Sequence, residues 1–242
     1  MAHAQSAVHA RGMNLKLTTT KKMQFTIKRI SAVQDVTRLK ADCIVIGVYQ
    51  NAVFTDAAQA IDSAAQGLLT RLANAGDLDG KPDTAHMLHE VAGIGAARVL
   101  VVGLGKHGEL DARGHALAVR CAARALSRPA MAHVAWTLTQ EQPAEFNPAP
   151  MLRDTVVAWR GEGYRFDRFK TVSESAASMP RKITLTIGAV HDKVARGALR
   201  EGEALADGIA LTRDRGAGRR TQRDRPDSRM REPAGGQCVQ TW

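Results

Sequence analysis

The feature that most constrains the fold is a continuous apolar segment within ADCIVIGVYQ, residues 41–50. A strand that is apolar at nearly every position is typical of a parallel sheet covered by helices on both faces. Thr55 follows as a plausible helix N-cap. Apolar residues then recur at the spacing of one helical face: Ala58, Ile61, Ala65, Leu68, Leu69 and Leu72. This pattern predicts a buried strand followed by one amphipathic helix that ends at the Asn-Ala-Gly stretch, 74–76.

The alternation of strand-like and helix-like segments continues along the chain. Further strands are predicted at 24–30, 86–91, 97–105, 133–139 and 183–188. Further helices are predicted at about 112–127, 151–166 and 192–212. The segments 86–91 and 97–105, separated by Gly-Ile-Gly, are expected to form a hairpin or two adjacent strands. This alternation indicates an α/β domain with a mixed, largely parallel sheet.

The basic residues that give the chain a formal net charge of +10 are concentrated near its two ends. Residues 1–22 contain four basic and no acidic residues, and residues 213–242 contain eight arginines and four acidic residues. The segment between them, 23–212, has 22 basic and 20 acidic residues. Nucleic-acid affinity depends on clustered Lys and Arg that neutralise phosphates. The sequence therefore predicts at most weak, nonspecific nucleic-acid binding, through the basic ends.

The two ends also lack the pattern of the rest of the chain. Residues 1–22 show no strand or helix period and no apolar core before a cleavage site, which predicts a disordered leader and not a secretory signal. The alternatives for the true translation start are Met1, Met13 and Met23. Residues 215–242 contain many arginines but no lysine. This composition indicates either a shifted reading frame or a disordered Arg-rich arm.

Cysteine usage and hydropathy indicate the compartment. Cys43, Cys121 and Cys238 are odd in number and far apart, which argues against a disulfide framework and for a reducing compartment. No apolar stretch approaches the roughly 18 residues that cross a bilayer. The chain is therefore predicted to be cytoplasmic with no membrane partner, and Cys43 and Cys121 are expected to be small core residues.

A glycine-rich stretch at 103–108, Gly-Leu-Gly-Lys-His-Gly, has the spacing of a dinucleotide-binding loop between a strand and a helix. Such a loop would direct backbone N–H groups at a pyrophosphate. However, the strand before it is not the first of the domain, and the next strand, 133–139, does not end in an acidic residue that could bind a ribose. The favoured interpretation is that these glycines only turn a strand into a loop.

A short histidine motif resembles a fragment of a metal site. His86 and His89 are followed by Glu90, but the spacing matches neither of the two helical zinc motifs. On a strand, residues 86 and 89 point to opposite faces and do not converge on one ion. The two histidines are therefore expected on the surface or at a strand edge.

The remaining polar residues suggest no catalytic set. Glu201, Glu203 and Asp207 share a predicted helix, but 201 and 203 face different directions, so a solvated helix surface is expected. No Ser, His and Asp occur in a nucleophile motif, and no carboxylates are as dense as a two-metal site requires. The residues alone therefore predict no catalytic site.

From Met23 to about Asp214, the order of segments resembles the leucyl aminopeptidase family M17. The matching pieces are ADCIVIGVYQ, AAQAIDSAAQGLLTRLANAGDLDGK, ARVLVVGLGK, VVAWRGEGYRFDRFK and EGEALADGIALTRD. The span DSAAQGLLTRLANAGDLDGK is the most telling, because family members have a similar apolar helix followed by a Gly-Asp turn and a Gly-Lys pair. The resemblance implies a macrodomain-like, three-layer α/β domain at 23–190. It also implies a linker helix at 191–214 that leads to a catalytic domain.

The resemblance further implies what the intact family does. Its members release amino-terminal residues from peptides with two divalent ions, Mn or Zn, and assemble as homohexamers. The family's Gly-Lys-Gly lysine, its metal-binding aspartate and glutamate residues and its Asn-Thr-Asp-Ala-Glu-Gly-Arg segment do not occur in this sequence. No catalytic, cofactor-binding or metal-binding residue is therefore predicted. The expectation is a non-catalytic amino-terminal domain, truncated before the catalytic domain and inactive alone.

Two further expectations concern binding. The alternative function is a binding module for nucleic acid or an ADP-ribose-like ligand, since some family members bind DNA and macrodomain-like folds bind ADP-ribose. The last predicted helix is expected to need a partner surface from the catalytic domain, because it carries four large apolar residues: Leu199, Leu205, Ile209 and Leu211.

Overall fold

A computed structural model describes residues 23–127, 131–140, 148–164, 179–188 and 192–223. The predicted leader, 1–22, and the end of the Arg-rich segment, 224–242, lie outside these ranges, so the predictions for them stay predictions. Within the same ranges, no helix combines the length and apolar character that a membrane span needs.

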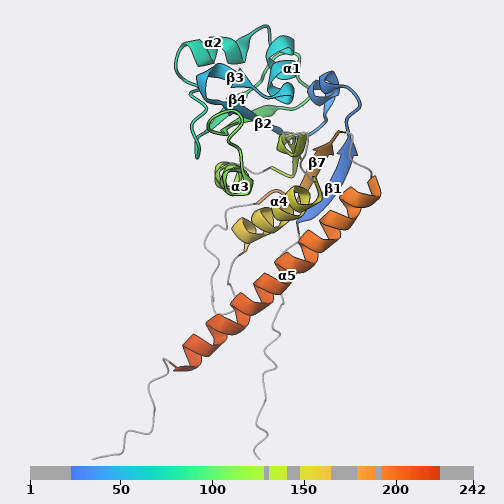
Figure 1. Cartoon of the computed structure of the whole chain (residues 1–242), viewed down its shortest axis with the longest axis vertical. Helices are drawn as coiled ribbons and strands as arrows, with labels where there is room; N and C mark the ends of the chain where they lie inside the picture. Colours follow the sequence, from blue (N-terminus) through green and yellow to red (C-terminus); the bar gives the residue numbers. More distant parts are fainter. Residues whose placement is uncertain (1–22, 128–130, 141–147, 165–178, 189–191, 224–242) are drawn as a thin grey trace, which may run out of the picture.

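In the described residues, seven strands form one mixed sheet (Figure 1). The strands are β1 (Gln24–Arg29), β2 (Cys43–Tyr49), β3 (Val53–Phe54), β4 (Ala85–His89), β5 (Arg98–Gly103), β6 (His133–Trp136) and β7 (Lys182–Ile187). Their order across the sheet is β1-β7-β6-β2-β5-β4, and β3 pairs with the end of β2. In this order, the neighbouring strands β1, β7, β6, β2 and β5 all run parallel. Strand β4 is antiparallel to β5, and β3 is antiparallel to β2. The predicted mixed, largely parallel sheet is confirmed.

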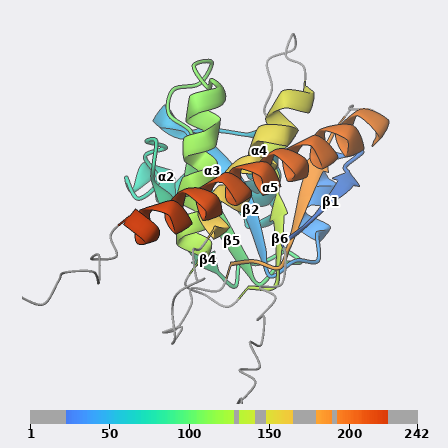
Figure 2. The same ribbon diagram turned by 90° about the horizontal axis from the view of Figure 1, so that it is seen from below.

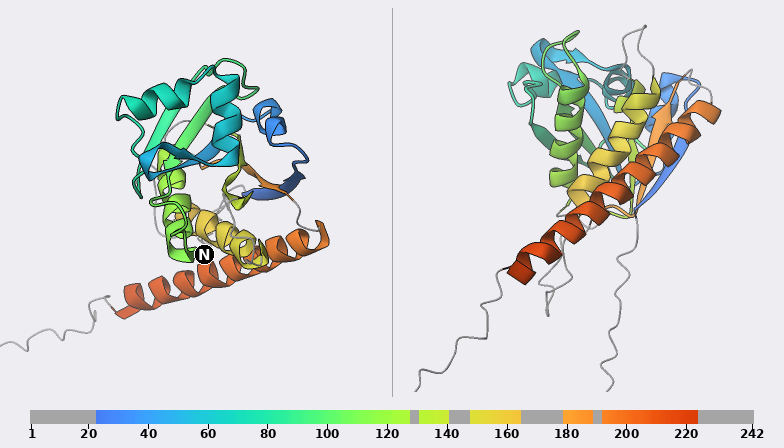
Figure 3. Two further views of the ribbon diagram at one scale, coloured as in Figure 1. Left: turned by 45° about the horizontal axis from the view of Figure 1, so that its top comes forward. Right: turned by 60° about the horizontal axis from the view of Figure 1, so that its bottom comes forward.

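Helices cover both faces of this sheet (Figure 2; Figure 3). The helical segments are η1 (Val33–Arg38), η2 (Gln50–Ala52), α1 (Asp56–Ala64), α2 (Leu68–Asn74), α3 (Ala112–Leu126), η3 (Leu138–Gln140), α4 (Pro148–Gly163) and α5 (Asp192–Arg223). Residues of η1, α1 and α2 join the core on one face, and residues of α3, α4 and α5 join the core on the other. The three-layer α/β arrangement is therefore present, and the likeness to macrodomains stays a prediction.

Strand β2 lies between the two cores, as its composition predicts. All seven of its residues are buried. Cys43 and Val45 belong to the core under α3 and α4, whereas Ile44 and Ile46 belong to the core under α1. Because successive side chains of a strand point to opposite faces, a strand that is apolar throughout needs cover on both sides.

The helix predicted to follow Thr55 begins where expected. The Thr55 hydroxyl accepts a hydrogen bond from the Ala58 N–H at 3.2 Å, which satisfies one of the free amide groups of the first turn. The hydroxyl also donates to the Gly47 carbonyl oxygen at 2.9 Å. The N-cap therefore also ties the start of α1 to strand β2.

The prediction of one helix up to residue 74 was wrong, because the chain breaks between α1 and α2. Gln66 and Gly67 have φ angles of 54° and 75°, in the left-handed region that ends a helix. The Asp62 carboxylate then accepts hydrogen bonds from the N–H groups of Leu69 and Thr70, at 2.7 and 3.1 Å. Apolar spacing does not reveal this cap, because Asp62 reaches it across the break.

Helix α5 is longer than predicted. Its apolar pattern predicts an end near Thr212, but the helix continues to Arg223, so that 215–223, predicted to be disordered, is helical. Arginine is a good helix former, and the next proline in the chain is Pro226. A glycine in a helix costs only about 1 kcal/mol relative to alanine. The helix runs along α4 and projects past it (Figure 1).

Candidate functional site

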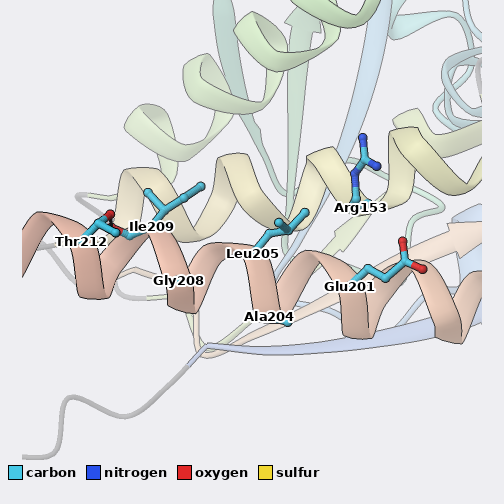
Figure 4. A pocket seen from close by; sticks show the side chains of 7 residues that line it. All are labelled: Arg153, Glu201, Ala204, Leu205, Gly208, Ile209 and Thr212. Atoms are coloured by element: carbon cyan, nitrogen blue, oxygen red, sulfur yellow. Dashed lines mark hydrogen bonds between the residues drawn. The ribbon is translucent and has the colours of Figure 1, made fainter.

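A groove with a volume of about 730 Å³ runs along α5 beside α4 (Figure 4). Its lining residues are one from α4 and six from α5: Arg153, Glu201, Ala204, Leu205, Gly208, Ile209 and Thr212. The middle of the groove is apolar, with Arg153 and Glu201 at one end and Thr212 at the other. A recess of this kind favours an apolar segment of a partner over a small charged ligand.

Several apolar residues of α5 are exposed, as the sequence predicts. Leu205 and Ile209 in the groove are 49% and 39% exposed, and Leu211 on the same helix is 52% exposed. The prediction that Leu199 needs a partner surface was wrong, because Leu199 is only 8% exposed and packs into the core under α3 and α4. Large apolar side chains that lie close together on a surface mark interaction sites. We therefore take the α4–α5 groove as the candidate functional site.

Helices α4 and α5 pack closely against each other beside the groove. A Cβ atom added at Gly202 would lie 2.7 Å from the Arg153 carbonyl oxygen and 2.9 Å from Val156 Cβ. The small residues Ala195 and Ala198 are also buried on the inner face of α5. Small residues on that face allow α5 to approach α4 closely, which leaves Leu205 and Ile209 at the rim.

Arg160 of α4 holds α5 in place through charge. Its guanidinium group donates hydrogen bonds to the carboxylates of Glu203 and Asp207, each at 2.9 Å, and its side chain is only 11% exposed. The same group lies 5.8 Å from the ring centroid of Phe25 in β1. A partly buried charge network contributes more than an isolated surface ion pair. Asp207 and Glu201 are exposed, as predicted for a solvated helix surface, whereas Glu203 is half-buried.

A second contact lies beyond the Thr212 end of the groove. The Tyr164 hydroxyl donates a hydrogen bond to the Asp214 carboxylate at 2.5 Å, and this bond raises the pKa of Tyr164. The Arg213 guanidinium lies 5.4 Å from the centroid of the Tyr164 ring. These contacts attach α5 to the end of α4.

The glycine-rich loop after β5 is used for packing. The N–H groups of Gly103, Leu104 and Gly105 donate at 2.9–3.0 Å to three backbone carbonyl oxygens: those of Thr84, Val48 and Gly80. At the start of α3, the Asp111 carboxylate accepts a hydrogen bond from the Gly114 N–H at 2.7 Å. Loop amides engaged in this way do not point at a phosphate, and an acidic cap repels one. The amides of 103–105 therefore contribute to packing, and the interpretation that the glycines only turn a strand into a loop stays a prediction.

Replacing Gly103 with alanine is expected to lower the free energy of unfolding by about 1–3 kcal/mol. The added methyl group would overlap the Lys81 carbonyl oxygen and the Thr84 hydroxyl. Urea unfolding followed by circular dichroism measures the effect. Gly161→Ala is the control, because nothing lies within 4 Å of a Cβ atom there. Equal destabilisation by the two substitutions would contradict this account of Gly103.

Two buried leucine side chains lie over the carboxyl end of β2. In open α/β folds, ligands bind at this edge of the sheet, where the strand order reverses. Leu104 and Leu138 are both buried and meet over Gly47, where an added Cβ atom would lie 2.7 Å from Leu138 Cδ2. This packing does not favour an ADP-ribose-like ligand at that edge.

The structure also places the other residues that the sequence singles out. His86 and His89 are exposed on β4, the last strand of the sheet order, so the strand-edge prediction is confirmed. Cys43 and Cys121 are buried as predicted, and burial raises the pKa of Cys43 to about 12. In the described part of the chain, no three His, Cys, Asp or Glu side chains come together as metal ligands.

The sequence analysis missed a buried aromatic stack between α3, β6 and α4. His115, Trp136 and Trp159 form successive edge-to-face pairs with centroid distances of 6.2 and 5.6 Å. Among the described residues, His115 Nε2 and both indole N–H groups have no hydrogen-bond partner. Burial lowers the pKa of His115 to about 4. The sequence contained one indication of this burial. His115 lies three and seven positions before Ala118 and Ala122, a spacing that places it on the apolar face of α3.

Comparison with known sequences identifies relatives. A sequence model described as "Cytosol aminopeptidase family, N-terminal domain" matches residues 45–173. A probable cytosol aminopeptidase of Ralstonia nicotianae is 44% identical over 181 residues, which are 73% of this chain and 36% of that protein. One of Ralstonia pickettii is 40% identical over 199 residues, 80% of this chain and 40% of that protein. The chain thus spans two fifths or less of the length of these relatives.

Comparison with solved structures agrees on the fold. A mutant of tomato leucine aminopeptidase superposes with a TM-score of 0.60 at 17% identity, over 78% of this chain and 37% of that one. The bottromycin maturation enzyme BotP, solved in complex with Mn, gives 0.51 at 20% identity, over 72% and 31%. At these identities the likeness shows the fold alone. The family match covers more than half of the sequence, and on that ground the chain belongs to the cytosol aminopeptidase family and contains its N-terminal domain.

Proposed function

We propose that the chain is the non-catalytic N-terminal domain of a leucyl, or cytosol, aminopeptidase and does not hydrolyse peptides by itself. The activity implied for the intact family is metal-dependent release of amino-terminal residues. The match to the family's N-terminal domain supports the proposal, together with relatives that are more than twice as long as the matched part. In the intact enzyme, two divalent ions, Mn or Zn, a homohexameric assembly and a cytoplasmic location are part of the same proposal.

The observation that carries the proposal is the α4–α5 groove. In the part of the chain that the structure describes, no three His, Cys, Asp or Glu side chains come together as metal ligands, and Glu203 and Asp207 pair with Arg160. These residues therefore do not fit a two-metal centre. Leu205 and Ile209 of α5, which are partly exposed, instead line an open recess. A domain whose acidic residues support its own packing, and which presents an apolar face, suits a role in docking.

The purified chain is expected to release no product from leucyl-p-nitroanilide in the presence of Mn²⁺ or Zn²⁺. Absorbance of free nitroaniline measures the reaction, and the full-length Ralstonia pickettii relative, assayed under the same conditions, is the positive control. Generation of hydroxide and polarisation of the carbonyl both need ions held by carboxylates. Release that copurifies with the chain and stops on chelation of the metal would overturn the proposal.

Weak, nonspecific nucleic-acid binding stays a second prediction. The basic segment 1–22 and most of the Arg-rich one lie outside the described residues, and the rest of the chain is nearly neutral. Binding of this kind weakens steeply as salt rises, because it depends on the release of counterions from phosphates.

A further inference from the structure

We propose that the β1–β7–β6 end of the sheet binds a small oxyanion of the phosphate or sulfate type. Lys28 and Lys182 supply the positive charge, and the Thr26 hydroxyl supplies a hydrogen-bond donor. The site lies on the sheet face that carries η1 and α1, opposite to α4 and α5. It is separate from the α4–α5 groove and does not rest on the proposed function.

Five polar side chains share this face of the sheet. In each of β1, β7 and β6, they alternate with apolar residues that pack into the core under α3 and α4. Strand β1 is the outermost strand, beside β7 (Figure 1). The two lysines are exposed, and Thr26 and His133 are half-buried, so solvent reaches the face at the β1 edge. The five residues are Thr26 and Lys28 of β1, Lys182 and Thr184 of β7, and His133 of β6.

The strand register places the two lysines on opposite sides of a pair of hydroxyl groups. Thr26 is the register partner of Thr184, Lys28 lies two positions after Thr26, and Lys182 lies two positions before Thr184. Each lysine Cα atom is therefore roughly 7 Å along the strand from the hydroxyl pair, within reach of its own side chain. Among the residues that the structure describes, neither ammonium group forms an ion pair. Two unpaired charges that flank donor groups attract an anion between them.

A chain of hydrogen bonds joins His133 to the proposed site. The Nε2 atom of His133 lies 2.8 Å from the Thr184 hydroxyl oxygen, which lies 2.9 Å from the Thr26 hydroxyl oxygen. Both nitrogens of an imidazolium ring donate, so a protonated His133 donates from Nε2 to Thr184. Thr184 then donates to Thr26, and the Thr26 hydroxyl is left to donate outward. Protonation of His133 therefore turns Thr26 into a donor for the anion.

The charges around His133 agree with this coupling. Burial lowers the pKa of His133, and the charges of Lys182 and Lys28 lower it further, whereas Asp42 and a hydrogen bond to the Lys40 backbone oppose the shift. The Asp42 carboxylate accepts a hydrogen bond from the His133 backbone N–H at 2.9 Å. An anion between the two lysines offsets their charge and favours the imidazolium form. Anion binding and protonation of His133 therefore strengthen each other by the same factor.

The first test follows the Hε1 resonance of His133 by NMR in the full chain between about pH 5 and pH 8. Sodium sulfate is the probe, because the charge of sulfate is constant in this range, and sodium chloride at equal ionic strength is the control. Sulfate is expected to raise the pKa of His133 by about half a pH unit. It is also expected to bind about threefold more tightly at pH 5.5 than at pH 7.5. The same pKa in both salts would overturn the proposal.

Two lysine variants test the position of the site. Lys28→Gln and Lys182→Gln are each expected to weaken sulfate binding about threefold at pH 5.5, as is typical for the loss of one exposed charge. Lys106→Gln is the matched control, because Lys106 is also exposed but follows the carboxyl end of β5. All three substitutions remove one positive charge. An equal loss in all three would show that net charge alone attracts sulfate, against a site at this face.

Variants of Thr26 test the hydrogen-bond chain. Thr26→Val keeps the shape of the side chain and removes the hydroxyl, so it is expected to weaken sulfate binding and to abolish most of its pH dependence. Thr26→Ser keeps the hydroxyl and is expected to retain both. Far-UV circular dichroism checks that the variants fold. Unchanged affinity and pH dependence in Thr26→Val would show that the hydroxyl does not bind the anion, and the proposal would fail.

Three further ligands identify the source of the anion. Inorganic phosphate and glycerol phosphate carry the same chemistry, and both are titrated at pH 5.5. Binding of both supports a site for the phosphate group of a small molecule, whereas binding of inorganic phosphate alone supports a site for the free ion. A short DNA duplex that shifts the His133 resonance when neither small anion does would assign the face to nucleic acid and overturn the proposal.

Discussion

Replacing Trp159 with alanine is expected to lower the free energy of unfolding by roughly 3–5 kcal/mol. Trp159 of α4 is completely buried, and its ring meets Trp136 of β6 edge to face at an interplanar angle of 86°. The substitution removes the apolar area of the ring, the ring–ring contact and the packing of α4 on the sheet. Because α5 packs on α4, the loss also loosens the packing between these two helices.

Urea unfolding followed by far-UV circular dichroism measures this loss. Trp159→Phe is the matched control, because it keeps an aromatic ring against Trp136 and leaves a smaller cavity. It is expected to destabilise the chain by less than the alanine variant. A loss below about 1 kcal/mol for Trp159→Ala would mean that α4 is not part of the cooperative core, since such a value is typical of partly exposed positions.

The stability of the chain is expected to fall as the pH drops from about 6.5 to about 4, through His115. Burial lowers the pKa of this imidazole to about 4 in the folded chain, and the charge of Asp154 opposes the shift only in part. In the unfolded chain the imidazole has its ordinary pKa of 6.5. Between pH 4 and pH 6.5 the unfolded chain therefore binds the proton and the folded chain does not. The contribution is therefore complete above pH 6.5 and is lost as the pH falls toward 4. The full loss is about 3 kcal/mol.

The measurement compares the wild type with His115→Leu at pH 7.5 and pH 4.5. Many carboxyl groups also titrate in this range, but they are common to both proteins and cancel in the difference. The free energy of unfolding of the wild type is expected to fall further than that of the variant, by about 2–3 kcal/mol. Parallel pH profiles of the two proteins would show that His115 is protonated as easily in the folded chain as in the unfolded one.

Much of the local structure could be predicted because it depends on neighbouring residues. The uniformly apolar composition of 43–49 requires cover on both faces, and the Thr55 hydroxyl caps a helix whose first turn follows it directly. Each of these inferences uses residues within a few positions of one another.

The candidate site could be predicted only in part. The apolar spacing of Leu205, Ile209 and Leu211 shows that α5 has apolar residues beyond its inner face, but not which of them are covered. Leu199 is also a leucine on α5, but it is buried because it packs with residues of the sheet and of α4. The pairing of Glu203 and Asp207 with Arg160 could not be predicted, because Arg160 is more than forty residues away in the sequence.

The sequence by itself determined the class of the fold, the central strand and the family, because these depend on local composition and on the order of segments. Only the tertiary structure decided the strand order, the pairing of Arg160 and the groove on α5. The physical reason is that these features join distant residues: Thr26 and Thr184, hydrogen-bonded at 2.9 Å across β1 and β7, are 158 positions apart. Burial and charge pairing at such separations depend on where whole elements pack, which no local pattern contains.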